Sequence, residues 1–162
     1  MQDIGFAGPE AASAATEILR EAARWLIERD RALWSPEQFS IQDTADHAAR
    51  GALVVAREDG VEVACMFADT SDPVCWPDRP EGSAFYLHKI AVRRSFAGRG
   101  WSRRLVDWAG DEARRRHIPA LRLDCDPRPE LIGLYRSLDF KDVDDYRTAF
   151  GFVARRFEKV LA

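Results

Sequence analysis

Residues 84–105 read Ala-Phe-Tyr-Leu-His-Lys-Ile-Ala-Val-Arg-Arg-Ser-Phe-Ala-Gly-Arg-Gly-Trp-Ser-Arg-Arg-Leu, and this order predicts a strand, a tight turn and the start of a helix. The segment 84–92 is apolar and rich in residues that favour strands. Period-2 spacing predicts that four of its side chains share one face: Tyr86, His88, Ile90 and Val92. Apolar residues then recur at helical spacing at Trp101, Leu105, Trp108, Ala109 and Ala113.

The turn Ala97-Gly98-Arg99-Gly100 lies between the expected strand and helix. Glycine permits a sharp turn and the close approach of a ligand, and the first N–H groups of a helix attract phosphate oxygens. The arginines around the turn are Arg93, Arg94, Arg99, Arg103 and Arg104. Guanidinium groups bind phosphate with paired hydrogen bonds, so the turn indicates a polyphosphate ligand. The alternative is a structural connection with solvated arginines, since neither a Walker A loop nor the three-glycine dinucleotide fingerprint is present.

Residues 90–105 resemble the acyl-CoA-binding motif of the GCN5-related N-acetyltransferases, which is written Gln/Arg-x-x-Gly-x-Gly/Ala. On this chain the motif corresponds to residues 97–102, where Gly100 matches and Ala97 and Ser102 depart from the pattern. The family uses both departing positions largely through backbone amides. The resemblance implies that the strand backbone pairs with pantetheine, that the turn amides hold the pyrophosphate, and that Arg93, Arg94 or Arg99 reaches the phosphates. The expected acetyl-CoA-binding residues are Ile90, Ala91, Val92, Arg93, Gly98, Arg99, Gly100, Trp101, Ser102 and Arg128.

Length and composition favour one globular domain over residues 1–162, with 46% hydrophobic and 31% charged residues. No apolar run approaches the roughly 20 residues of a membrane span, and the N-terminus lacks a signal-peptide pattern. Cys65, Cys75 and Cys125 form no paired framework, so we expect reduced thiols in a cytoplasmic protein. The net charge of −3 argues against nucleic acid and favours a small anionic ligand at the arginine turn.

The remaining segments predict a mixed order of strands and helices. Strands are expected at 3–7, 52–57, 61–68, 84–92, 121–125, 142–146 and 149–159, and helices at 9–30, 35–50, from about 101 to before Pro119, and at 129–138. This order resembles the acetyltransferase layout. It implies an α/β (α+β mixed) fold, in which about four helices flank a twisted, mostly antiparallel sheet of about seven strands. In that fold the strands at 84–92 and 121–125 splay apart, and acyl-CoA lies between them.

A second segment, Leu134-Tyr135-Arg136-Ser137-Leu138-Asp139-Phe140, is similar to the family's Leu-Tyr-x-x-x-Gly-Phe. Asp139 replaces the glycine, but aspartate tolerates a left-handed backbone, so we expect the helix-ending turn to survive. Tyr135 is the candidate catalytic acid, because a phenol can protonate the departing CoA thiolate. The alternative is a tyrosine that only packs against the sheet.

His88 is the candidate general base for the attacking amine, directly or through water, with a purely structural histidine as the alternative. His47 and His117 have weaker claims. The resemblance places six residues where this family usually builds its acceptor pocket: Trp25, Arg31, Trp34, Phe39, Asp69 and Trp76. Plain core packing is the alternative for all six and the favoured prediction for Trp25 and Phe39. No metal site is expected, because the histidines are scattered and the cysteines lack ligand spacing. A covalent acyl-cysteine intermediate at Cys125 is a less favoured route, since members of the family generally transfer the acyl group directly.

We therefore expect an N-acetyltransferase that passes an acetyl group from acetyl-CoA to a primary amine of a small molecule. A protein or peptide N-acetyltransferase and a non-catalytic acyl-CoA sensor are the alternatives. A nucleic-acid-directed enzyme is disfavoured by the acidic charge, and no membrane association is expected. Because many relatives form dimers, a homodimer is a further expectation.

Overall fold

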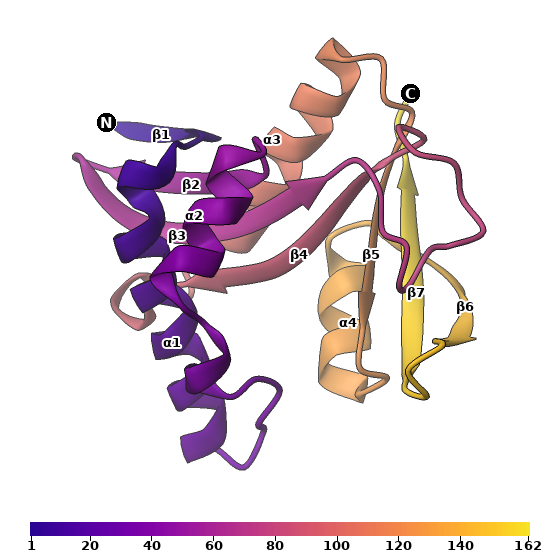
Figure 1. Ribbon diagram of the computed structural model, residues 1–162, viewed down its shortest axis with the longest axis horizontal. Coiled ribbons are helices and arrows are strands. Elements are labelled where there is room, and N and C mark those ends of the chain that lie inside the picture. Colours follow the sequence, from indigo (N-terminus) through magenta and orange to yellow (C-terminus); the bar gives the residue numbers. More distant parts are fainter. The chain divides into compact units, whose positions relative to one another are not determined.

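The computed structural model describes residues 1–162, and its elements follow the expected order (Figure 1). The strands are β1 (Gln2–Phe6), β2 (Leu53–Glu58), β3 (Val61–Asp69), β4 (Phe85–Val92), β5 (Ala120–Cys125), β6 (Lys141–Arg147) and β7 (Val153–Val160). The helices are α1 (Ala12–Glu28), α2 (Ile41–Ala49), α3 (Trp101–Arg115) and α4 (Pro129–Ser137). The strands form one seven-stranded sheet in the order β1-β2-β3-β4-β5-β7-β6, which confirms the expected mixed fold class.

The strands β4 and β5 form a parallel pair in a sheet whose outer pairs, β1 with β2, β2 with β3, β5 with β7 and β6 with β7, are antiparallel. A parallel pair needs a crossover connection, and α3 supplies it. Only two residue pairs join the strands, Phe85 with Leu121 and Tyr86 with Arg122. β4 itself runs to Val92 and β5 to Cys125.

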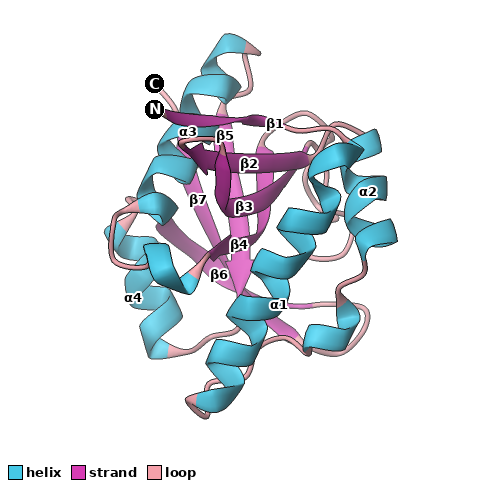
Figure 2. Ribbon diagram, turned by 90° about the vertical axis from the view of Figure 1, so that its left-hand side faces the viewer, coloured by secondary structure: helices cyan, strands magenta, loops and turns pink.

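The chain divides into two compact units, the first formed by Met1–Phe67 with Lys89–Leu105. In this unit α1 and α2 lie side by side against the strands β1 to β3, as Figure 2 shows. Alanine-rich α1 turns Ile18 and Leu19 inward, where they meet Leu53 of β2 and Phe67 of β3 in one buried cluster. The two helices are also tied by a 2.8 Å hydrogen bond between the hydroxyl groups of Thr16 and Thr44.

The second unit consists of Ala68–His88 and Val106–Ala162. Its core gathers Cys75, Trp76 and Ala84 from the segment between β3 and β4, together with Tyr86 of β4. Two buried arginines complete it. The Arg122 guanidinium donates to Glu158 and to the Tyr86 hydroxyl, and that of Arg156 donates to Asp78 and Asp144.

The predicted single helix over 35–50 is wrong. The expected Ser35 capping box forms, but the turn that it starts ends at Gln38, and Phe39 is extended and buried. Ser40 then caps α2, because its hydroxyl accepts the N–H of Asp43 at 3.0 Å. The sequence therefore contains two helix starts five residues apart.

Two smaller predictions also need correction. The last strand begins at Val153 and not at 149, because the chain turns between Thr148 and Phe152. Lys89 has a left-handed backbone, with φ of 54°, in the middle of β4. This conformation interrupts the period-2 alternation, so the predicted common face of Tyr86, His88, Ile90 and Val92 does not continue past His88.

None of the helices combines the length and the apolar character that crossing a membrane requires.

Candidate active site

The glycine turn leads directly into α3, as the sequence predicts. Gly98 and Gly100 both have left-handed φ angles, 76° and 79°, which explains why glycine stands at these positions. The carbonyl of Gly100 accepts the N–H of Arg104, so Gly100 is the residue from which the helical ladder starts. The N–H groups of Trp101 and Ser102 precede that first helical donor and have no acceptor inside the helix. This end of α3 is suited to bind an anion.

The arginines around the turn differ in what their side chains contact. The Arg93 guanidinium donates to the carbonyl of Glu62 at 2.6 Å, and that of Arg94 stacks 4.4 Å above the Trp25 ring. Burial lowers the pKa of Arg94. Arg99 keeps 57% of its side chain exposed, although its guanidinium lies 3.9 Å from the Glu58 carboxylate and 4.9 Å from the centre of the Phe96 ring. Of the three arginines predicted to reach phosphate, Arg99 is therefore the exposed one, while Arg93 and Arg94 are half-buried.

The end of β4 is only partly enclosed by side chains. Ala91 is buried in the core cluster of the first unit, while the flanking Ile90 and Val92 are half-buried. The next amide, of Arg93, donates to the carbonyl of Val63 at 2.8 Å. Their part in binding remains a prediction. Arg128, also predicted to bind acetyl-CoA, precedes α4 as its N-cap residue and pairs with Asp126.

Tyr135 lies on α4 in the second unit, and its ring packs against Phe140 and Phe157 at centroid distances of 6.3 and 5.8 Å. Burial raises the pKa of this phenol, and the neighbouring Cys125 and Asp124 raise it further. The hydroxyl therefore stays protonated at neutral pH, as a proton donor must. The turn after α4 also forms as predicted, since Asp139 adopts a left-handed φ of 69° and the N–H of Phe140 reaches the carbonyl of Tyr135.

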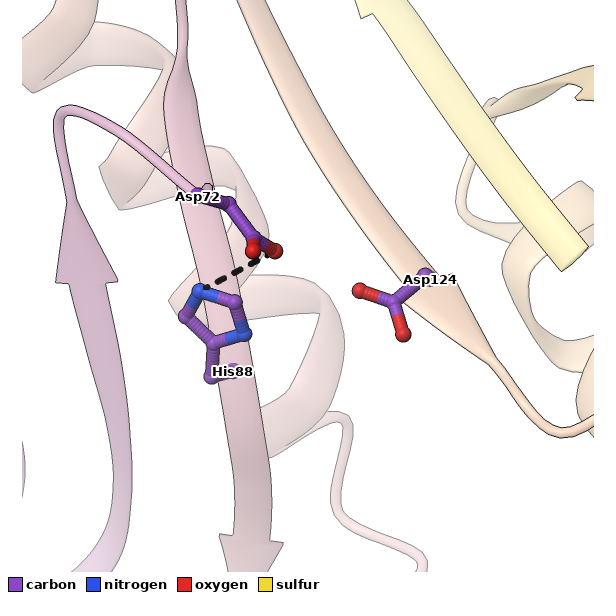
Figure 3. Close-up of side chains that lie close together, drawn as sticks. All are labelled: Asp72, His88 and Asp124. Atoms are coloured by element: carbon purple, nitrogen blue, oxygen red, sulfur yellow. Dashed lines mark ion pairs between the residues drawn. The ribbon is translucent and has the colours of Figure 1, made fainter. Parts of the chain in front are cut away.

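His88 stands on β4 in the same unit, beside two aspartates that the sequence analysis did not single out. Figure 3 shows His88 of β4, Asp72 of the segment after β3 and Asp124 of β5 pointing toward one another. One nitrogen or oxygen atom from each side chain lies within 4.8 Å of the others. Nε2 of His88 is 3.9 Å from Oδ2 of Asp72. No sequence motif joins these residues, although Asp72-Pro73 is a turn signal that fixes Asp72 locally.

The other histidines have structural surroundings. The His47 ring stacks on Phe67 at 3.9 Å, and its Nδ1 is 2.8 Å from the carbonyl of Asp43. His117 has a left-handed backbone at the end of α3, where its N–H reaches the carbonyl of Arg114. His88 is thus the histidine whose ring lies beside two carboxylates.

All three cysteines are free and buried. Burial raises the pKa of the Cys65 and Cys125 thiols to about 12. A thiol with such a pKa is almost entirely protonated at neutral pH and is a weak nucleophile. The environment of Cys125 thus argues against a covalent acyl-cysteine intermediate.

The residues expected near the acceptor amine have mixed surroundings. Phe39 is core, and Trp76 is fully buried under the Arg156 guanidinium at 4.6 Å. Trp25 is only half-buried and lies between two arginines, so the prediction that it is plain core is wrong. Trp34 packs edge-on against Phe39 and under the ammonium of Lys89 at 4.9 Å.

Comparison with known proteins agrees with this architecture. The model of the acetyltransferase (GNAT) family matches residues 15–140. A protein of Bacillus subtilis (strain 168), named uncharacterized N-acetyltransferase YesJ, is 30% identical over 122 residues, which are 72% of this chain and 68% of that protein.

Solved structures share the fold over the whole chain. An acetyltransferase of the GNAT family from Listeria monocytogenes superposes with a TM-score of 0.83 at 21% identity, covering 99% of this chain and 95% of that one. The PaiA N-acetyltransferase of Thermoplasma acidophilum, solved in complex with coenzyme A, gives 0.77 at 14% identity and covers 99% of each chain.

Proposed function

The chain belongs to the acetyltransferase (GNAT) family, and from this premise we propose that it transfers the acetyl group of acetyl-CoA to a primary amine of a small molecule by direct attack. The family assignment makes it an acetyl-CoA-dependent N-acetyltransferase; the kind of amine and the roles of individual residues are the proposal. The observation that carries it is the strand, glycine turn and helix of residues 85–115, with two left-handed glycines ahead of the first helical amides.

Acetyl-CoA would be held by this segment. The amides of residues 98–102 and the exposed Arg99 would bind its phosphates. The amides donate hydrogen bonds at a helix N-terminus, and the Arg99 guanidinium adds a positive charge. The backbone of Ile90, Ala91 and Val92 would pair with the pantetheine amides, in the manner of an added strand. Arg93 and Arg128 are further predicted contacts.

Proton transfer is assigned to two residues of the second unit. Tyr135 donates a proton to the leaving thiolate, and its raised pKa keeps the phenol protonated until the thioester is attacked. His88 accepts a proton from the amine, directly or through one water, and the Asp72 carboxylate lies 3.9 Å from its Nε2.

Direct attack is favoured over a cysteine-bound intermediate. The Cys125 thiol is the candidate nucleophile on β5, but burial holds it protonated. A neutral amine is the better nucleophile at the same pH, once it has lost its proton. The acetyl group therefore moves directly from sulfur to nitrogen.

The proposal is tested first by calorimetric titration with acetyl-CoA and, separately, with CoA that lacks the 3′-phosphate. Micromolar binding of acetyl-CoA is expected, and weaker binding without the 3′-phosphate would show that arginine contacts reach that group. Amines are then screened by the thiol that turnover releases. Failure of folded protein to bind either nucleotide would refute the proposal.

Two alternatives stay in the screen. A peptide α-amino group carries the same chemistry as a small amine, so short peptides are tested beside small amines. A non-catalytic acyl-CoA sensor predicts binding without any thiol release. A cytoplasmic location, a single domain over 1–162 and a homodimer remain predictions from the sequence.

A further inference from the structure

The cluster of Asp72, His88 and Asp124 contains two carboxylates and an imidazole in the same compact unit (Figure 3). It draws on three separate segments, the turn after β3, the middle of β4 and the end of β5. What such a set of lone pairs attracts is a cation, and how each atom is held and how far apart the atoms lie decide which cations fit.

Asp72 is fixed in place by its own turn. Its Oδ1 accepts the N–H groups of Val74 and Cys75 at 3.1 and 2.9 Å, and its carbonyl accepts that of Trp76 at 2.9 Å. Its side chain is only 7% exposed. Oδ2 makes no hydrogen bond in the protein and is directed at His88 across 3.9 Å, which is too long for a hydrogen bond. Oδ2 of this largely buried side chain thus keeps lone pairs that face the cluster.

Asp124 is connected to Asp72 through Cys75. The Cys75 backbone N–H donates to Asp72, and its thiol hydrogen-bonds to Asp124. Burial raises the pKa of this thiol, and the two carboxylates raise it further, so it remains a neutral donor. Cys75 therefore contacts both carboxylates.

The spacing of the three atoms admits more than one cation. A transition metal with bonds of about 2.1 Å brings neighbouring ligand atoms to about 3.0–3.4 Å from one another. An ammonium group that donates three tetrahedral hydrogen bonds of about 2.8 Å separates its acceptors by about 4.6 Å. The one measured pair, at 3.9 Å, lies between these separations, and all three atoms lie within 4.8 Å of one another. An ammonium group can therefore reach all three atoms, and the amine that an N-acetyltransferase requires favours this cation over a metal.

We propose that Asp72, His88 and Asp124 form the acceptor site, in which the three atoms bind the protonated amine of a strongly basic alkylammonium substrate. This inference rests on the proposed function, which it extends by naming the residues and the substrate class. The His88 imidazole takes one proton from the bound ammonium, so that one N–H bond breaks, another forms on the ring, and the amine regains its lone pair. Weakly basic arylamines, which are neutral in solution, would gain nothing from the two carboxylates.

The direct test is NMR titration of the full-length protein with butylammonium chloride, following the His88 ring signals, which a His88→Gln variant assigns. Tetramethylammonium chloride at equal ionic strength is the control ligand, because it has the charge but no N–H donor. Saturable shifts at His88 are expected with butylammonium alone. Asp72→Asn and Asp124→Asn should each weaken that binding by about ten- to a hundredfold, as expected for a lost charged hydrogen bond.

Asp107→Asn on α3 is the matched control, since it removes one exposed carboxylate outside the cluster and should leave the affinity for butylammonium unchanged.

The amide introduced by Asp72→Asn keeps an oxygen that can accept the two backbone N–H groups. If this variant nevertheless unfolds, Asp124→Asn decides the question. Unchanged butylammonium affinity in Asp124→Asn would overturn the proposal. So would micromolar binding of Zn²⁺ or Mn²⁺ that is lost in Asp124→Asn and that butylammonium does not displace, because the cluster would then be a metal site. Acetyl-CoA binding, measured separately, reports on the proposed function, so the two can fail independently.

Discussion

Oδ2 of Asp72 faces Nε2 of His88 across 3.9 Å, while Oδ1 of the same carboxylate is held by two backbone amides. The carboxylate is thus anchored on one side and open on the other. Oδ2 of Asp72 therefore faces the His88 ring, and the lone pairs of this oxygen are not used in a hydrogen bond. The base proposed at His88 therefore has a carboxylate as its neighbour.

His88→Gln tests the role of the base. The glutamine keeps a polar side chain on β4 but cannot accept a proton at neutral pH. We expect kcat to fall by about a hundredfold or more, the usual contribution of a general base, with the affinity for acetyl-CoA unchanged. Steady-state kinetics and calorimetry give both numbers. His47→Gln, which alters a ring stacked on Phe67, is the control and should leave kcat near the wild-type value.

Tyr135→Phe tests the role of the acid. The ring contacts with Phe140 and Phe157 remain, so the fold should be kept while kcat, measured by thiol release, falls by about tenfold to a hundredfold. Unchanged turnover would mean that the tyrosine only packs.

The raised pKa of Tyr135 also predicts a stability effect at high pH. The native state favours the neutral phenol, so its contribution is complete below the unfolded pKa near 10 and declines as pH rises above that value. Urea unfolding between pH 8 and 11 should therefore show a shallower alkaline loss in Tyr135→Phe than in the wild type. Equal slopes would contradict the burial of this hydroxyl.

Gly100→Ala separates backbone strain from ligand contact. The residue has φ of 79°, and a Cβ there would meet open space, so the protein should lose only about 1 kcal/mol of unfolding free energy. If acetyl-CoA approaches this backbone closely, its affinity should fall about tenfold or more as well. Gly60→Ala in the β2–β3 turn has φ of 81° and equal space, and should share the stability loss without the loss of affinity. If Gly100→Ala and Gly60→Ala bind acetyl-CoA with equal affinity, the phosphate site lies elsewhere in the protein.

Cys125→Ala tests the direct route of transfer. The buried thiol is held protonated by its raised pKa of about 12, so it should not carry the acetyl group. We expect kcat within a few-fold of the wild type and no acetylated protein by intact mass spectrometry after incubation with acetyl-CoA alone. An acetyl adduct of the wild type that is absent from the variant would establish the covalent route instead.

Arg156→Met tests the buried cation of the second unit. The side chain is 4% exposed and donates to Asp78 and Asp144, whose pKa values it lowers through those hydrogen bonds. Its loss should cost about 2 kcal/mol in urea unfolding at pH 7, a moderate figure because both aspartates can regain water. Depressed carboxyl pKa values stabilise the protein above about pH 4 and lose that effect as pH falls through them, so the variant should lose less stability between pH 5 and 2 than the wild type.

The sequence by itself determined the order of elements, the glycine turn before α3 and the left-handed turn at Asp139, because each depends on contacts within a few residues. It also identified Tyr135 and His88 as candidates, through a family motif in one case and through strand position in the other. It missed the second helix start at Ser40, where two capping signals compete within five residues and burial of Phe39 decides between them.

Only the tertiary structure brought Asp72 and Asp124 to His88, since these residues are separated from it by 16 and 36 positions. Nothing local marks Asp124, an aspartate near the end of a strand, as different from other aspartates. The left-handed Lys89 is likewise set by the sheet as a whole. Local chemistry fixes which elements form, but only the packing of strands from distant parts of the chain fixes which charges meet.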